Sequence, residues 1–81
     1  MKRTPRELAA NDLIKLLHKR YTYEVSRRVG NHIRLTTTKN GEHHITIPNH
    51  NPIKLGTLSS ILTDIASHLN ITKQQLLDEL F

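Results

Sequence analysis

The sequence predicts an α+β domain with two layers, in which helices cover one face of a three-stranded antiparallel sheet. Apolar residues recur at helical spacing over 10–20 and 58–69, and the three segments between them are rich in residues that favour strands. Asn40-Gly41 separates the last two of these segments, as in a tight hairpin. The expected order is therefore α-β-β-β-α, followed by a short C-terminal helix.

The length of the chain, 81 residues, predicts a single domain over 1–81, with one modest core and no deep interdomain cleft. The chain has no cysteine, which excludes disulfides and thiolate metal sites and favours a reducing compartment. No apolar run approaches the ~20 residues that cross a bilayer, and no signal-peptide pattern follows the basic start. We therefore expect a soluble, cytoplasmic protein without a membrane partner.

The first helix is expected over about 10–20, with Asn11 or Asp12 as its cap or first-turn acid. The expected strands, each bounded by turn residues, are 21–29, 31–38 and 42–47. Pro48 ends the last strand because it cannot donate a hydrogen bond to a ladder.

The clearest helical pattern begins beyond Gly56 and ends at Asn70, a typical C-terminal stop. Thr72 and Gln75 fit a capping box for a short last helix. The expected core consists of Ile33, Leu35, Ile45 and Ile47 from the sheet, and Leu13, Ile14, Leu17, Leu58, Ile61, Leu62 and Ile65 from the helices.

Side chains alternate along a strand, so each strand that contributes to the core also presents an outward row. The outward residues of the second and third strands are His32, Arg34, Thr36, His44 and Thr46. A regular first strand would add Glu24, Ser26 and Arg28 to this face. Gly30 weakens the last inference because it can mark a bulge that changes which residues face outward.

The net charge is +5, and the excess of Lys and Arg lies in the first two thirds of the chain. Residues 1–28 hold eight basic and three acidic residues, whereas 57–81 hold one basic and three acidic residues. Such a field favours a polyanionic partner such as nucleic acid, although many small basic proteins have no such partner.

Several motifs together resemble those of one known family. They are the opening 2–7, the helical segment 13–17, the Gly30-Asn31-His32 step, the exit 47–50 and the segment 54–62. In this order and spacing they resemble the HicA (YcfA-like) toxins of prokaryotic toxin–antitoxin systems, over nearly the whole chain.

The resemblance implies a double-stranded-RNA-binding-domain-like fold, ribosome-independent cleavage of mRNA without a cofactor, and neutralisation by a HicB antitoxin. The essential histidine of the family maps onto His32, after Gly30 and Asn31, where relatives often have serine or aspartate in place of Asn31. The loop 49–55 departs from the family, because Asn-Pro-Ile stands where many members carry a charged segment. The second helix is also longer than in the commonest short members.

His32 is expected to be a general base that removes the proton of a ribose 2′-hydroxyl, a role worth ~10²–10⁴-fold in rate. The group that stabilises the phosphorane or protonates the leaving oxygen stays open among Arg34, His44, His50 and Lys54. The expected RNA-binding residues are Arg27, Arg28, Asn31, Arg34 and Lys54. The free amides near Gly56 and Thr57 fit either a phosphate site or a plain helix start.

No metal site is expected, since His43 and His44 point to opposite faces of a strand and no cysteine is available. Three other functions stay open: a non-catalytic double-stranded-RNA-binding module, a DNA-binding regulator and a purely protein-binding role. The outward side of the second helix carries no cation, which argues against a helix in a DNA groove. The oligomeric state, with a homodimer among the alternatives, and the base preference are not determined.

Overall fold

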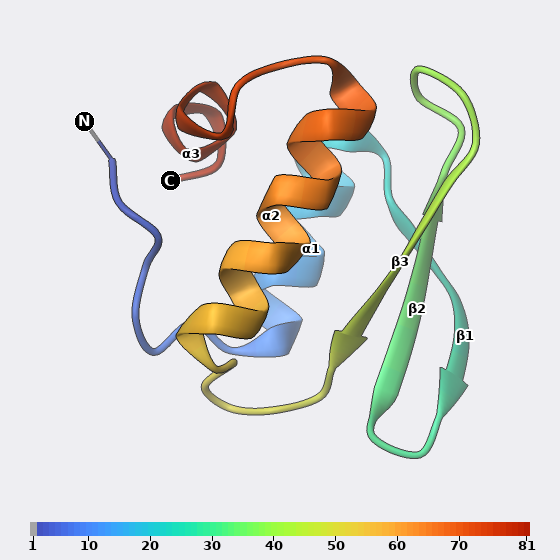
Figure 1. Ribbon diagram of the computed structural model, residues 1–81. Coiled ribbons are helices and arrows are strands. Elements are labelled where there is room, and N and C mark those ends of the chain that lie inside the picture. The colour runs from blue at the N-terminus through green and yellow to red at the C-terminus, as the bar shows by residue number, and fades with distance from the viewer. Residues whose placement is uncertain (1) are drawn as a thin grey trace.

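The computed structural model describes residues 2–81 and confirms the α+β architecture. Its elements in chain order are α1 (Ala10–Tyr21), β1 (Glu24–Val29), β2 (His32–Thr37), β3 (His43–Pro48), α2 (Leu55–Leu69) and α3 (Lys73–Leu80). The strands form one antiparallel sheet in the order β1-β2-β3. Figure 1 shows α1 and α2 on the same side of this sheet, so that its other face is free of helices. None of the helices within 2–81 is long and apolar enough to cross a membrane.

The core lies between the inner face of the sheet and the helices. All of the predicted core residues are buried except Ile14, which is half-buried. The core also takes in buried residues beyond those listed above as its expected members, among them Tyr21, Tyr23, Ile53, Leu76, Leu77 and Leu80. The last three of these come from α3, which therefore packs as part of the helical layer.

The first strand begins at Glu24, so the prediction of a strand from Tyr21 is wrong. Tyr21 instead continues the buried stripe of Leu13 and Leu17 by one more helical turn. The helix then ends at Thr22, whose φ of 59° is left-handed and whose backbone N–H donates to the carbonyl of His18 at 3.1 Å.

The start of α1 differs in one respect from the prediction. The N-cap is Ala9, which makes no side-chain cap bond, while Asp12 lies in the first turn as expected. Asn11 is therefore helical and does not cap α1. The carboxylate of Asp12 still lies where the positive end of the helix dipole favours it.

The predicted C-terminal end of α2 and the predicted capping box at the start of α3 are confirmed. Asn70 closes α2 in the left-handed conformation, with φ of 58°. At the start of α3 the Gln75 backbone N–H donates to the Thr72 hydroxyl at 3.0 Å, and the Thr72 N–H donates to the Gln75 side chain at 2.8 Å. The helix α2 begins at Leu55, so Gly56 lies inside its first turn and not before it.

A pair of stacked histidines ties the sheet to α2. The rings of His43 and His68 have centroids 4.3 Å apart and planes 7° apart. The Nδ1 atom of His43 lies 2.7 Å from the Tyr23 hydroxyl, and its Nε2 atom lies 3.3 Å from Asp64 Oδ1. The His68 Nε2 atom bonds the carbonyl of Lys39 in the β2–β3 hairpin at 2.9 Å. Within residues 2–81 no group of three or more His, Asp and Glu side chains is gathered as a metal site.

The burial of Tyr23 predicts a loss of stability in alkali. Burial, aided by the Asp64 carboxylate, raises the pKa of the Tyr23 phenol to about 12. An unfolded tyrosine titrates near pH 10, so this stabilisation is complete below about pH 10 and is lost between about 10 and 12. We expect Tyr23 to account for about 1 kcal/mol of lost unfolding free energy at pH 11, measured by urea denaturation.

The control for this prediction is Tyr23→Phe. This variant should be less stable at pH 8, because it lacks the bond to His43, but its stability should fall less steeply above pH 10. An equal alkaline slope in both proteins would contradict the assignment.

Candidate functional site

The outer face of the sheet carries the residues that the sequence singled out. His32 and Arg34 are both exposed on β2, while Ile33 and Leu35 between and after them are buried. Arg34 lies opposite Thr46 of β3. A shallow hollow of about 200 Å³ is lined by Arg27, Val29, His32, Arg34 and Thr46. The expected histidine and two of the expected arginines therefore share one surface site.

A bulge in β1 decides which arginine reaches this face. Val25 lies opposite Leu35, but Arg27 lies opposite Arg34, so one extra residue, Ser26, is inserted into β1. The extra residue reverses the alternation after it. Arg27 then points to the outer face, and Arg28 lies opposite Ile33, on the other face.

The outward position of Arg28 was expected only for a regular first strand, and the bulge removes that condition. Regular alternation held for Glu24, which lies opposite the outward Thr36, and failed after the bulge. Arg28 is nevertheless exposed, because β1 lies at the edge of the sheet. Val29 takes the outward position opposite His32, and regular alternation gave no reason to expect it there.

The bulge is held by hydroxyl groups of the outer face. The Ser26 hydroxyl donates to the carbonyl of Arg34 at 3.3 Å, and the Thr36 hydroxyl donates to Ser26 at 3.0 Å. The Thr36 hydroxyl also lies 2.8 Å from Nδ1 of His44. The side chains around the bulge thus connect all three strands.

A two-residue turn brings the end of β1 directly next to His32. Val29 pairs with His32, and the turn between them contains Gly30 at φ 55° followed by the exposed Asn31. The carbonyl of Asn31 accepts a hydrogen bond from the Asn49 backbone N–H at 2.6 Å. The Gly30 turn and the exit of β3 are therefore joined beside His32.

The other predicted residues lie outside the hollow. Lys54 is exposed at the N-cap of α2, and His50 is exposed in the loop after β3. His44 is on the outer face but pairs with Thr36, four residues along β2 from His32, which corresponds to about 13 Å. His44 is therefore too far from His32 to act on the same phosphate.

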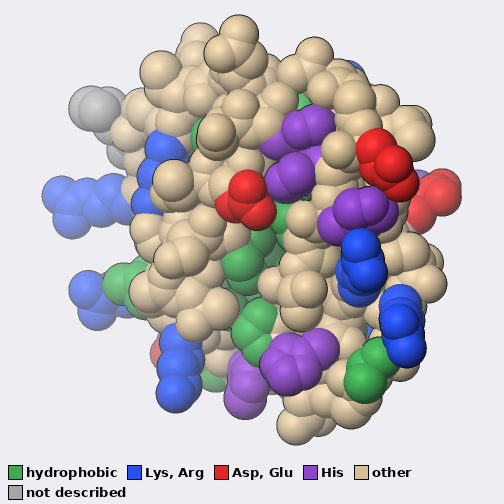
Figure 2. Space-filling model, turned by 45° about the vertical axis from the view of Figure 1, so that its right-hand side comes forward, with side chains coloured by type: hydrophobic (Ala, Val, Ile, Leu, Met, Phe, Trp, Pro, Cys, Tyr) green, Lys and Arg blue, Asp and Glu red, His purple; other side chains and the backbone are tan. Residues whose placement is uncertain are grey.

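The site is cationic and holds no carboxylate. Within residues 2–81 the ion pairs are His43 with Asp64 and His44 with Glu42, so Arg27 and Arg34 are not paired with an acid. In Figure 2 most of the acidic side chains that are visible lie in the upper half of the view, while histidine, Lys or Arg, and hydrophobic side chains lie at its lower right. The hollow therefore suits an anion, and an imidazole lies within it.

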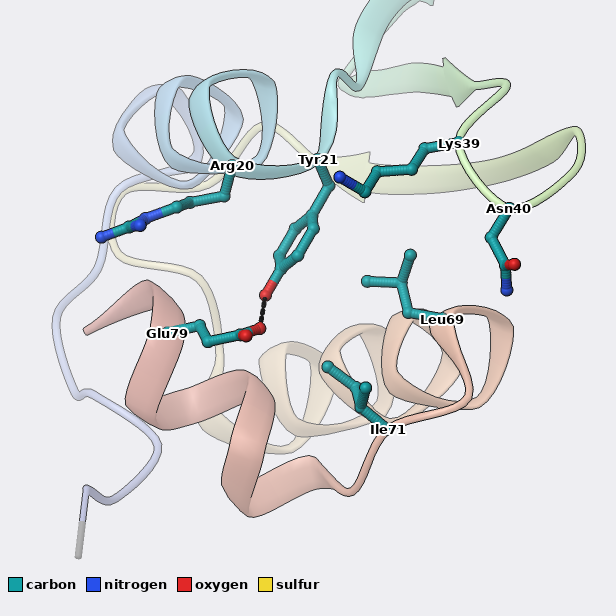
Figure 3. Close-up of a pocket in the computed structure, with 7 residues that line it drawn as sticks. All are labelled: Arg20, Tyr21, Lys39, Asn40, Leu69, Ile71 and Glu79. Carbon is teal, nitrogen blue, oxygen red and sulfur yellow. Dashed lines mark hydrogen bonds between the residues drawn. The ribbon is translucent and has the colours of Figure 1, made fainter.

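A larger hollow lies at the opposite end of the sheet. It measures about 530 Å³ and is lined by Arg20, Tyr21, Lys39, Asn40, Leu69, Ile71 and Glu79 (Figure 3). The Tyr21 hydroxyl donates to the Glu79 carboxylate, and burial, with help from Glu79, raises the pKa of this phenol far above its usual range. The phenol thus stays neutral and is no base near pH 7. We assign this bond a structural role, the connection of α1 to α3.

Comparison with known protein families agrees with these features. A family model described as the HicA toxin of bacterial toxin–antitoxin systems matches residues 10–66, which include every residue of the hollow around His32. No match was found among curated proteins or among solved structures. Because the matched segment makes up more than half of the sequence, the chain belongs to the HicA toxin family of bacterial toxin–antitoxin systems.

Proposed function

We propose that this protein is an endoribonuclease that cleaves mRNA without a metal ion, with His32 as the general base. The neutral imidazole takes the proton of a ribose 2′-hydroxyl. The 2′ oxygen then forms a bond to the adjacent phosphorus, and the bond from phosphorus to the 5′ oxygen of the next nucleotide breaks. The products are a 2′,3′-cyclic phosphate and a 5′-hydroxyl, which receives a proton.

One observation carries this proposal: His32 is exposed in a hollow that it shares with two arginines without acidic partners. Arg27 and Arg34 lie opposite each other on neighbouring strands and line the same hollow, so both can reach a phosphate bound there. Charged donors in this position stabilise the extra negative charge of the phosphorane. Family membership supports the same function and implies an antitoxin partner.

The remaining expected residues have separate roles in the proposal. Arg34 supplies a guanidinium fork that suits phosphate oxygens, so we assign it charge stabilisation and not proton donation. His44 is excluded by its separation from His32, which leaves His50 and Lys54 as alternatives for protonating the leaving oxygen. Asn31 and Arg28 would contact RNA beyond the hollow, where the strand continues past the cleaved bond, and Lys54 would do the same if His50 is the proton donor.

The first test is the removal of the base. We expect His32→Ala to reduce the rate of RNA cleavage at least about 100-fold, because a general base contributes that much, while RNA affinity is kept. The measurement is single-turnover cleavage of labelled mRNA, with binding measured separately. His44→Gln is the matched control, since this histidine lies on the same face but outside the hollow, and it should retain activity.

Two results would contradict the proposal. Equal cleavage by the wild type and His32→Ala would remove His32 from the mechanism. A wild type that binds RNA with high affinity but never cleaves it would indicate the non-catalytic RNA-binding module instead.

The bulge provides a second test, with two adjacent arginines as a matched pair. Arg27→Ala should weaken RNA binding several-fold and reduce the slope of log affinity against log salt by about 0.7 to 1, the value of one lost phosphate contact. Arg28→Ala should change both quantities less, because Arg28 faces the other side of β1. If Arg28→Ala had the larger effect, the hollow would not be the phosphate site.

A further inference from the structure

The strand β1 is unusual because none of its six residues is buried. The strands β2 and β3 each bury residues on their inner face, whereas β1 is held mainly by its ladder to β2. Figure 1 shows β1 at the edge of the sheet, with one side paired to β2 and the other side open. An edge of this kind presents unpaired backbone N–H and C=O groups to another chain.

The exposed apolar residues of the protein concentrate on this edge. Within residues 2–81 the large hydrophobic side chains that are exposed are Val25, Val29 and Leu55, and two of these belong to β1. Val25 is 40% exposed on the inner side of the strand, and Val29 is 55% exposed on the outer side, next to His32. A segment added along β1 would therefore cover apolar surface on both sides of the sheet.

We propose that the free edge of β1 binds an extended, acidic segment of a partner protein, which adds a fourth strand to the sheet. The charges select this occupant. Arg27 and Arg28 are adjacent on the edge and are paired with no acid in the described part of the chain. Alternate residues of an added strand face opposite sides of the sheet. Carboxylates on one side would neutralise the arginine on that side, and apolar residues on the other side would cover the valine there.

A second copy of this chain is a poor occupant of the same edge. Two β1 strands side by side would bring four arginines together, which like-charge repulsion disfavours. The bulge at Ser26 interrupts the edge for any added strand, so continuous pairing is confined to one side of the bulge. The residues Arg27–Val29, beyond the bulge, offer the uninterrupted part.

A partner bound at the edge of β1 would also regulate RNA cleavage, because this edge borders the hollow around His32. This part of the inference rests on the proposed function. Arg27 and Val29 line the hollow around His32 as well as belonging to β1. A strand that engages them would compete with the RNA phosphate for Arg27. A bound partner would therefore inhibit cleavage by raising the apparent KM for RNA without changing kcat.

The docking test uses the full chain with His32→Ala, so its result does not depend on cleavage. The probe is a fluorescent, blocked peptide of four Glu-Val repeats, and binding is followed by anisotropy and by amide shifts in NMR spectra. We expect the largest shifts at β1 and at least a tenfold loss of affinity when Arg27→Glu and Arg28→Glu are combined. A peptide of Lys-Val repeats should not bind.

A further control distinguishes strand pairing from charge attraction. The same Glu-Val peptide with N-methyl groups on alternate residues keeps its charge but loses hydrogen-bond donors on one edge. Two such peptides, methylated on even or on odd residues, should differ in affinity, because only one edge of an added strand faces β1. Equal binding of both, or binding of the Lys-Val peptide, would overturn the proposal.

Further results would test the docking edge and the proposed function separately. Amide shifts confined to residues outside β1 would overturn the proposal, and so would self-association through β1 in sedimentation experiments. A wild type that does not cleave RNA, while the peptide still binds β1, would refute the proposed function and leave the docking edge standing. If the wild type cleaves RNA and the peptide binds without raising KM, the regulatory part is wrong.

Discussion

The site depends on a conflict of register within the β1–β2 hairpin. The two-residue turn at Gly30 pairs Val29 with His32, whereas the inner face of the sheet pairs Val25 with Leu35. These two registers differ by one residue, so a regular ladder between β1 and β2 cannot contain both pairs. The extra residue, Ser26, resolves the difference and is held by hydroxyl contacts to Arg34 and Thr36. Because of this bulge, Arg27 joins His32 on the outer face.

The rest of the molecule holds the sheet in place and leaves its outer face accessible. The helices α1 and α2 lie on the same side of the sheet, so no helix covers its outer face. The stacked imidazoles of His43 and His68 hold the opposite end of the sheet against α2, and the Tyr21 bond to Glu79 connects α1 to α3. Both of these contacts lie away from the cationic hollow. The side chains that could bind RNA have no structural ion pairs to break.

Because β1 lies at the edge of the sheet, the strand that lines the hollow is also open to a partner protein. The strand supplies Arg27 and Val29 to the hollow and also has an unpaired side. Substrate and partner would therefore meet at a common set of residues, which is a simple physical basis for inhibition of a small toxin by its antitoxin. The match to the toxin family covers this strand, while α3 lies outside the matched residues. The hollow and its edge thus belong to the family portion of the chain.

The sequence by itself determined the order of elements, the core of the sheet, the capping of α3 and the outward direction of His32 and Arg34. It also determined the position of the hairpin at Asn40-Gly41, although the connection spans 38–42 and is longer than the tight turn expected. These features follow from local periodicity and turn chemistry, which act over a few residues. Only the tertiary structure decided that Tyr21 extends α1, since its burial against neighbouring elements outweighed its strand propensity. It also decided that Arg27, and not Arg28, faces outward. That choice arises from pairing between two strands, and the pattern of either strand alone does not contain it.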